Sequence, residues 1–307
     1  MPVSERITAP YEALTQEVAL VDRSERGKLA LTGPEAKSFL TGQVSNDIEA
    51  LTPGSGCYAA LLTNKGKMLG DLRAIDTADE LWLDTERVAL QVLFDTIRRG
   101  TVGWQAELHK RTVQQALLSL VGPRAVEVVG EVGPEHANRR AELGGAAVLL
   151  IATDVGVDVV CAAEDSERVR AALGVAEVTE ADAEVVRVER GRPRYGVDLD
   201  DSTIPQEAGL NERAVSFTKG CYVGQETVAR LHYRGKPNRH LRGLRLSEPV
   251  ATGTPLALGE REVGRLASSL VSPRLGPIAL ALVRREAEPG AVLAAGAATA
   301  TVVELPF

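Results

Sequence analysis

Short apolar runs and stretches of helical periodicity alternate along the first third of the chain, with turns rich in glycine and proline between them. The apolar runs are typical of strands. They cover residues 28–32, 57–63, 68–75 and 81–84. Two stretches space their apolar residues as helices do, one beginning at Pro34 and one over residues 86–98. This pattern predicts a first α/β domain within residues 1–112.

A second α/β unit is predicted over residues 113–179. Its expected strands are residues 117–121, 148–151 and 155–162, and its expected helices are residues 134–143 and 164–173. The resulting order of strands and helices is typical of a ferredoxin-like layer. A polar cap at residues 179–182 then predicts a further helix, and we interpret residues 180–240 as the chain returning to the first domain.

From residue 241 onward, short β-like runs alternate with glycine and proline turns. Turn residues at this density predict a small β-barrel or sandwich over residues 241–307. The fold class predicted for the whole chain is therefore α+β, with the ferredoxin-like unit inserted between two parts of one domain.

The chain has 307 residues and a net charge of −7, which argues against general affinity for nucleic acid. Residues 187–245 are locally basic, with 12 Lys and Arg against 7 Asp and Glu, which favours a local anion site or a solvated arginine-rich surface. The three cysteines have no metal-ligand spacing, so we expect no resident metal. Residues 1–6 lack the apolar core of a signal peptide and no apolar run could span a bilayer, so we expect a cytoplasmic location without membrane contact.

The most distinctive stretch is the octapeptide Lys-Gly-Cys-Tyr-Val-Gly-Gln-Glu at residues 219–226. Cys221 would lie just before a helix N-terminus, where the helix dipole favours an anion, and Lys219 adds a nearby positive charge. Both influences favour the thiolate, the reactive form of cysteine. A small buried hydrophobic residue beside a turn is an equally good interpretation of Cys221 from the spacing alone.

The octapeptide, together with residues 228–230 and 234–235, resembles the signature of the YgfZ family. These are folate-binding proteins related to the glycine cleavage T protein and tied to assembly or repair of iron–sulfur proteins. Further segments resemble motifs of the wider T-protein superfamily, and they are residues 31–36, 42–47, 187–193, 204–210 and 277–281. The resemblance implies a T-protein-like three-domain arrangement and tetrahydrofolate, or a derivative, as cofactor.

The resemblance also implies residues that contact the folate. Glu189 lies in an RxExG motif, whose glutamate in the superfamily is expected to bind the pterin; a surface ion pair with Arg187 or Arg190 is the alternative. Asp71 matches the aspartate that acts near the reacting folate nitrogen, or it pairs with Arg73. We expect Glu189 and Asp71 to share one pocket.

The glycine-cleavage enzymes typically carry a GGxxDD-like stretch here, and this aspartate is part of it. Lys67 and Gly70 stand here where that pattern has a glycine and its first aspartate. This departure weakens the case for aminomethyl transfer by the chain.

The remaining predicted site residues surround the octapeptide. Cys221 and Lys219 are the predicted catalytic pair, and Tyr222 is predicted to stack on the heterocycle or to pack in the core. Arg230 and Arg234 share a helix face at i, i+4 and are predicted to contact anionic groups of the folate. The other motif positions are Gly220, Gly224, Gln225 and Glu226.

Two hypotheses follow. The first is a folate-binding accessory protein for iron–sulfur proteins, and through them for tRNA-modifying enzymes, in which Cys221 is essential. The second is a folate-dependent aminomethyl- or methyltransferase of the T-protein type, in which Asp71 is essential. Because Cys221 has no evident task in one-carbon transfer, the sequence favours the first hypothesis.

Overall fold

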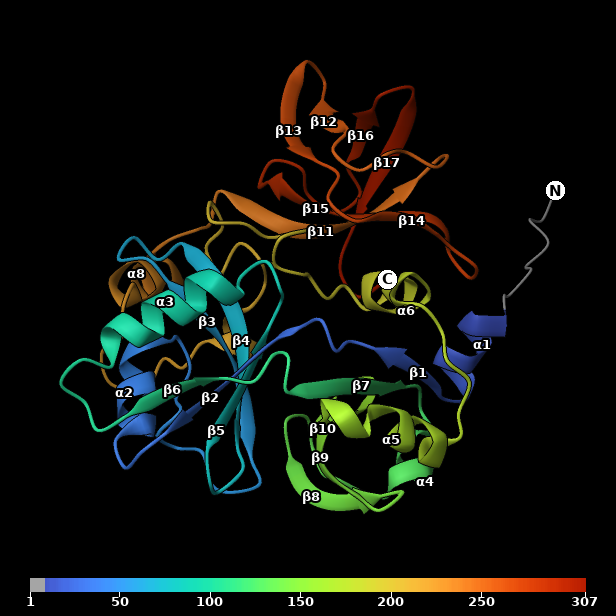
Figure 1. The fold of residues 1–307 in the computed structure, drawn as a ribbon. Helices are drawn as coiled ribbons and strands as arrows, with labels where there is room; N and C mark the ends of the chain where they lie inside the picture. Colours follow the sequence, from blue (N-terminus) through green and yellow to red (C-terminus); the bar gives the residue numbers. More distant parts are fainter. Residues whose placement is uncertain (1–8) are drawn as a thin grey trace.

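The structure is a computed structural model that describes residues 9–307. The segment tested above for a signal peptide, residues 1–6, lies outside this range. Three sheets and the helices between them form three lobes (Figure 1). Within the described residues, no helix combines the length and the apolar character needed to cross a membrane.

The first sheet has the strand order β3-β4-β5-β2-β6. Its strands are β2 (Gly27–Thr32), β3 (Gly56–Leu62), β4 (Met68–Asp76), β5 (Leu81–Thr85) and β6 (Glu107–Lys110). Helices α2 (Ala36–Gln43) and α3 (Leu90–Gly100) bury apolar side chains, among them Phe39, Leu93 and Ile97, in one core with the sheet. The predicted strands and helices of this region are confirmed, although α3 begins four residues later than expected.

The second sheet is antiparallel throughout, in the order β1-β7-β10-β9-β8. Its strands are β1 (Ala19–Asp22), β7 (Gln115–Val121), β8 (Asn138–Leu143), β9 (Ala146–Thr153) and β10 (Gly156–Ala162). Helix α4 (Ala125–Val129), the 3₁₀ turn η1 (Ala163–Asp165) and helix α5 (Ser166–Leu173) accompany them. The place beside β7 is taken by β1, which comes from the N-terminal segment (Figure 1).

The predicted helix over residues 134–143 is wrong, because its second half is strand β8. Gly144 and Gly145 both have positive φ angles, 58° and 77°, and thus form the two-residue hairpin that pairs β8 with β9. The preceding helix lies earlier in the chain, at α4. The observed order of strands and helices therefore differs from the one that suggested a ferredoxin-like layer.

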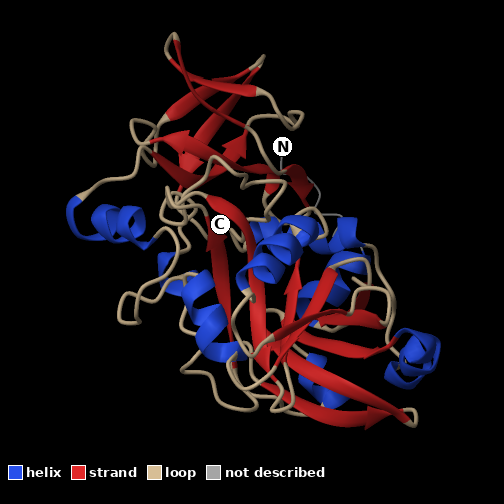
Figure 2. Ribbon diagram, turned by 60° about the vertical axis from the view of Figure 1, so that its left-hand side comes forward, coloured by secondary structure: helices blue, strands red, loops and turns tan. Residues whose placement is uncertain are grey.

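The return segment begins with α6 (Glu180–Glu189), whose N-terminus has the predicted polar cap: Thr179 and Asp182 form a reciprocal capping box. Helix α6 packs against α1 (Ala9–Gln16) and lies between the second sheet and the C-terminal sheet (Figure 1). The segment ends with the short helix α7 (Asn211–Ala214) and with α8 (Gln225–Arg234), which stands out from the body in a second view (Figure 2).

The C-terminal sheet is one curled antiparallel sheet of seven strands, ordered β13-β12-β16-β17-β11-β15-β14. Its strands are β11 (Arg239–Leu246), β12 (Pro255–Leu258), β13 (Arg261–Arg265), β14 (Ser269–Ser272), β15 (Gly276–Arg284), β16 (Val292–Ala295) and β17 (Ala298–Val303). It encloses its own apolar core. The expected small β-barrel is thus a half-barrel, since β13 and β14 remain as edges.

Candidate functional site

Asp71 lies on β4, where the first sheet faces the second sheet and the return segment. Successive side chains of a strand point to opposite faces, so Gly70 and Asp71 face opposite ways. A Cβ atom at position 70 would lie 2.5 Å from Cδ1 of Leu93 and 2.9 Å from Cβ of Ala89. A side chain at position 70 would therefore point into the helix-covered core. Glycine in place of aspartate there takes no carboxylate away from the cavity that Asp71 lines.

That cavity has a volume of about 210 Å³ and lies where three parts of the chain meet. The first sheet contributes Tyr58, Asp71 and Arg73, the second unit contributes His136 and Asp158, and the return segment contributes a further set. The return segment's residues at the cavity include Val186, Arg187, Arg190, Arg192, Arg194, Tyr195 and Arg213. We call this space the Asp71 cavity.

The carboxyl group of Asp71 is buried, and the Tyr58 hydroxyl donates a hydrogen bond of 2.5 Å to its Oδ2. Burial raises the pKa of Asp71 to about 6, and the nearby Glu86 carboxylate adds to this, whereas the Tyr58 hydrogen bond opposes it. A carboxyl group with this pKa can both take up and release a proton near neutral pH, as general acid–base catalysis requires.

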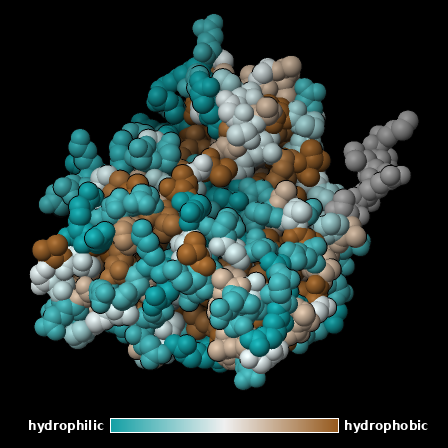
Figure 3. All heavy atoms as spheres, in the orientation of Figure 1, coloured by the Kyte–Doolittle hydropathy of each residue, from teal (hydrophilic) through white to brown (hydrophobic). Residues whose placement is uncertain are grey.

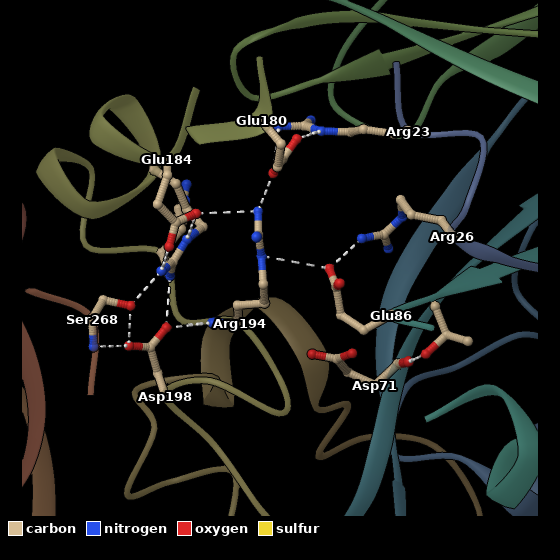
Figure 4. Close-up of polar contacts among 12 residues, drawn as sticks. Arg23, Arg26, Asp71, Glu86, Glu180, Glu184, Arg194, Asp198 and Ser268 are labelled. Atoms are coloured by element: carbon tan, nitrogen blue, oxygen red, sulfur yellow. Dashed lines mark hydrogen bonds and ion pairs between the residues drawn. The ribbon is translucent and has the colours of Figure 1, made fainter. Parts of the chain in front are cut away.

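Ion pairs around the cavity use most of its positive charge (Figure 4). Arg194 lies between Glu180, Glu184 and Glu86, and Arg26 contacts Glu86 and Asp84. Asp71 sits beside this cluster in the same view, without an arginine partner. These arginines are therefore engaged with other carboxylates, and within the part of the chain that the structure describes no cation forms an ion pair with the Asp71 carboxyl group.

The predicted pairing of Asp71 with Arg73 is not what the structure contains. Arg73 binds Asp84 at 2.7 and 2.9 Å and Asp158 at 2.7 Å. The partner of Asp71 is Tyr58, which sequence reasoning missed. The pairing of β3 with β4 indicates this contact. Tyr58 stands opposite Arg73, and residues 71 and 73 share a face of the sheet, so the Tyr58 side chain lies on the same face as Asp71.

Glu189 does not line the Asp71 cavity. The Tyr11 hydroxyl lies 3.0 Å from both of its carboxylate oxygens, the Ser272 hydroxyl donates to Oε1, and Arg274 lies 3.6 Å from Oε2. These contacts join α1, α6 and the C-terminal sheet.

Glu189 instead lines a neighbouring cavity of about 570 Å³, which we call the Glu189 cavity. Asp154 and Arg190 line both spaces. The expectation of one shared pocket for Asp71 and Glu189 is thus corrected to two adjoining cavities.

The octapeptide lies outside both cavities, and its cysteine is exposed. Lys219 is turned inward: its ammonium group donates to the carbonyl oxygens of Thr41, of Val44 at 2.7 Å and of Asn46 at 2.8 Å. Burial lowers the pKa of Lys219 to about 8. All three N–H groups of the ammonium are used to bind carbonyl oxygens at the C-terminal end of α2. In this structure Lys219 therefore stabilises the fold.

Tyr222 and Gly224 also serve the local fold. Tyr222 is buried in an apolar cluster with Leu62 and Val228, and the Lys219 ammonium lies 4.7 Å from its ring centre. Gly224 has a φ of 85° and precedes α8 without a side-chain cap. A Cβ atom at position 224 would lie 2.6 Å from the carbonyl oxygen of Thr63.

The other predicted residues of this region lie on the surface. Cys221, Gly220, Glu226, Arg230 and Arg234 are exposed, and Gln225 is half-buried. None of them lines the Asp71 or the Glu189 cavity. On the face shown in Figure 3, hydrophilic residues predominate and hydrophobic residues form scattered patches.

Comparison with known proteins agrees with this architecture. A family model described as the GCVT N-terminal domain matches residues 2–219. An aminomethyltransferase of Rubrobacter xylanophilus is 29% identical over 320 residues, a match that covers 98% of this chain and 86% of the relative. The crystal structure of the glycine cleavage system aminomethyltransferase T from Bartonella henselae superimposes with a TM-score of 0.87 at 22% identity, covering 97% of this chain and 88% of that one. The structural likeness establishes a shared α+β fold.

The two motif glycines give a matched pair of stability predictions. Gly224→Ala forces an L-residue into a left-handed conformation against a backbone oxygen, so it should lower the free energy of unfolding by about 1–3 kcal/mol. Gly220→Ala adds its Cβ where nothing lies within 4 Å and should change stability by less than about 0.5 kcal/mol. Urea denaturation measures both. Equal effects of the two substitutions would contradict the local geometry.

The raised pKa of Asp71 predicts a pH dependence of stability. Between the ordinary value of 3.8 and about 6, the folded chain holds a proton that the unfolded chain releases, so stability falls as pH rises through this window. The decline due to this group should be about 3 kcal/mol at most. Asp71→Asn should remove it, whereas the exposed Asp79→Asn should not. Wild type and Asp71→Asn unfolding curves that stay parallel from pH 4 to 7 would contradict the prediction.

Proposed function

Because the chain belongs to the family defined by the GCVT N-terminal domain, we propose that it binds a reduced folate in the Asp71 cavity and transfers a one-carbon unit, as an aminomethyltransferase does. The observation that carries this proposal is the Asp71 carboxyl group, which is buried at the wall of the cavity and has its pKa raised to about 6. The damaged motif does not argue against it, because position 70 points away from the cavity.

The cavity residues fit a reduced folate. Tyr58 occupies Oδ2 of Asp71, and within residues 9–307 no group donates to Oδ1, which leaves this oxygen to accept from an N–H of the pterin. Val121, Val155, Ala183 and Val186 supply apolar wall and Tyr195 a flat ring. The volume of about 210 Å³ suits a bicyclic heterocycle, with the remainder of the molecule extending outside it.

A reduced folate would supply the ring nitrogen that receives the one-carbon unit. Asp71, as a carboxylate, would accept a hydrogen bond from that nitrogen and take up its proton as the nitrogen bonds to the carbon of the aminomethyl donor. The bond from that carbon to the donor's leaving group breaks with its electron pair, and the proton passes from Asp71 to the leaving group. Tyr58 fixes the orientation of the carboxyl group through its 2.5 Å hydrogen bond. The surrounding ion pairs keep the walls rigid and hold the arginines away from the carboxyl group.

The predicted contact of Glu189 with the pterin stays a prediction. The group is already bound by Tyr11 and Ser272, and a ligand in the Asp71 cavity would reach it only past Arg190 and Asp154. Arg230 and Arg234, predicted to contact the folate tail, lie on α8 outside both cavities.

Asp71→Asn keeps the shape of the side chain but removes its capacity to take up a proton. It should slow transfer of a labelled one-carbon unit from an aminomethyl donor to tetrahydrofolate by about 100-fold or more. Folate affinity should change by less than about tenfold, as expected for one altered hydrogen bond. Wild-type activity should decline as the pH is lowered through about 6, because the reactive form of Asp71 is the carboxylate. The control is Asp79→Asn, and full activity of Asp71→Asn would overturn the role of Asp71.

A second candidate function rests on the exposed thiol. Cys221 lies in a loop held by Lys219 and Gly224, on the surface and away from both cavities. An accessible cysteine on an anchored loop suits contact with another protein, which is what the accessory role for iron–sulfur proteins, and through them tRNA-modifying enzymes, requires. Under this hypothesis, the folate cavity and the Cys221 thiol are two separate sites.

Cys221→Ser should fold and bind folate as the wild type does, yet fail to restore iron–sulfur enzyme activity in cells that lack the protein. The control is Thr218→Ala, an exposed neighbour outside the octapeptide. Complementation by the serine variant at the wild-type level would remove Cys221 from the function and leave one-carbon transfer as the sole candidate.

A further inference from the structure

His136 is the residue that the proposed function leaves unexplained. It lines the Asp71 cavity from the loop between α4 and β8. Its φ of 71° is a left-handed conformation that non-glycine residues rarely adopt. The backbone is held there by its N–H, which donates to the carbonyl oxygen of Ala152 at 2.8 Å. Such strained positions tend to occur where a side chain must be aimed at a ligand.

The two ring nitrogens of His136 differ in their surroundings. Nδ1 is sealed from solvent and has no hydrogen-bond partner among the described residues. Nε2 lies 3.7 Å from Oε1 of Glu135, too far for a hydrogen bond, and no other group of the part of the chain described here bonds to it. Since the ring lines the cavity and its Nδ1 is enclosed, Nε2 is the nitrogen that a ligand can reach.

The charges nearby fix the state of the ring. Burial, with the positive charge of Arg73, lowers the pKa of His136 to about 4, so the imidazole is neutral near pH 7. A neutral imidazole carries one N–H. The Glu135 carboxylate beside Nε2 favours the proton on that nitrogen. The other tautomer would place a buried N–H at Nδ1, where it has no acceptor among the described residues, and would therefore have the higher free energy.

We propose that His136 is a ligand-binding residue that donates its Nε2–H to a carbonyl or carboxylate oxygen of the folate in the Asp71 cavity. The inference rests on the proposed function. It gives the ligand contacts of opposite polarity, an acceptor at Asp71 on β4 and a donor at His136 in the loop between α4 and β8. A bicyclic ring with adjacent N–H and carbonyl groups can satisfy both, whereas a purely apolar molecule can satisfy neither.

The test uses tetrahydrofolate, binding calorimetry, three variants at position 136 and one control variant, all in the full chain. His136→Gln places an amide N–H near the former Nε2 and should bind within about threefold of the wild type. His136→Asn, too short to reach the ligand, and His136→Gly should each weaken binding by about tenfold, as for one lost hydrogen bond. His232→Asn on the exposed α8 is the matched control and should bind normally.

A stability measurement separates binding from folding. Glycine and asparagine tolerate the left-handed conformation, so His136→Gly and His136→Asn should unfold at or above the wild-type temperature. Nitrogen NMR of labelled histidine should show the proton of His136 on Nε2.

Wild-type affinity in both His136→Asn and His136→Gly, or a proton on Nδ1, would overturn the inference while leaving the folate site intact. Absence of folate binding by the wild type itself would overturn the proposed function, and this inference with it.

Discussion

A buried chain of ion pairs joins the first and second sheets, and the cavity depends on it. The carboxylate of Asp84 has no exposed surface, and it is bound by Arg26 at 2.8 Å and by Arg73 at 2.7 and 2.9 Å. Arg73 continues to Asp158 on β10, at 2.7 Å. These charges hold the pKa of Asp84 well below its usual range, although burial alone would raise it. Removing either arginine would leave the buried Asp84 carboxylate with one partner in place of two, and breaking a buried ion pair from one side is strongly destabilising.

This arrangement also explains the state of Asp71. Both Asp71 and Asp84 lie near Arg26, but the guanidinium groups of Arg26 and Arg73 bind Asp84. Among residues 9–307, the side chain of Asp71 has only the phenolic hydroxyl group of Tyr58 as a partner. Burial favours the neutral form of both groups, but the two bound arginines outweigh it at Asp84. Asp84 therefore stays ionised, whereas the pKa of Asp71 is raised to about 6. Neighbouring carboxyl groups with pKa values shifted in opposite directions occur at many proton-transfer sites.

Local patterns predicted the strands of the first sheet, the capped helix α6 and the β-rich C-terminal part, because each has a strong periodicity or cap within its own residues. The helix expected at residues 134–143 failed because the glycine pair at 144–145 makes a hairpin, and hairpin pairing overrides weak helical periodicity. Asp71 could be singled out from its own segment, whereas its partner Tyr58 follows only once the register of β3 against β4 is known.

The placement of Glu189 in another cavity, and the inward turn of Lys219, depend on contacts across more than eighty residues of sequence. No local pattern encodes such contacts. Residues that look equivalent in a motif can therefore have different tasks: Lys219 caps a helix, while the neighbouring Cys221 meets solvent.

The central claim is that the folate site is the Asp71 cavity, and a crystal structure of the chain with tetrahydrofolate tests it most directly. We expect the pterin in that cavity, with an N–H of its ring within hydrogen-bond distance of the Asp71 carboxyl group. A pterin bound in the Glu189 cavity, or on the surface of α8, would contradict the claim.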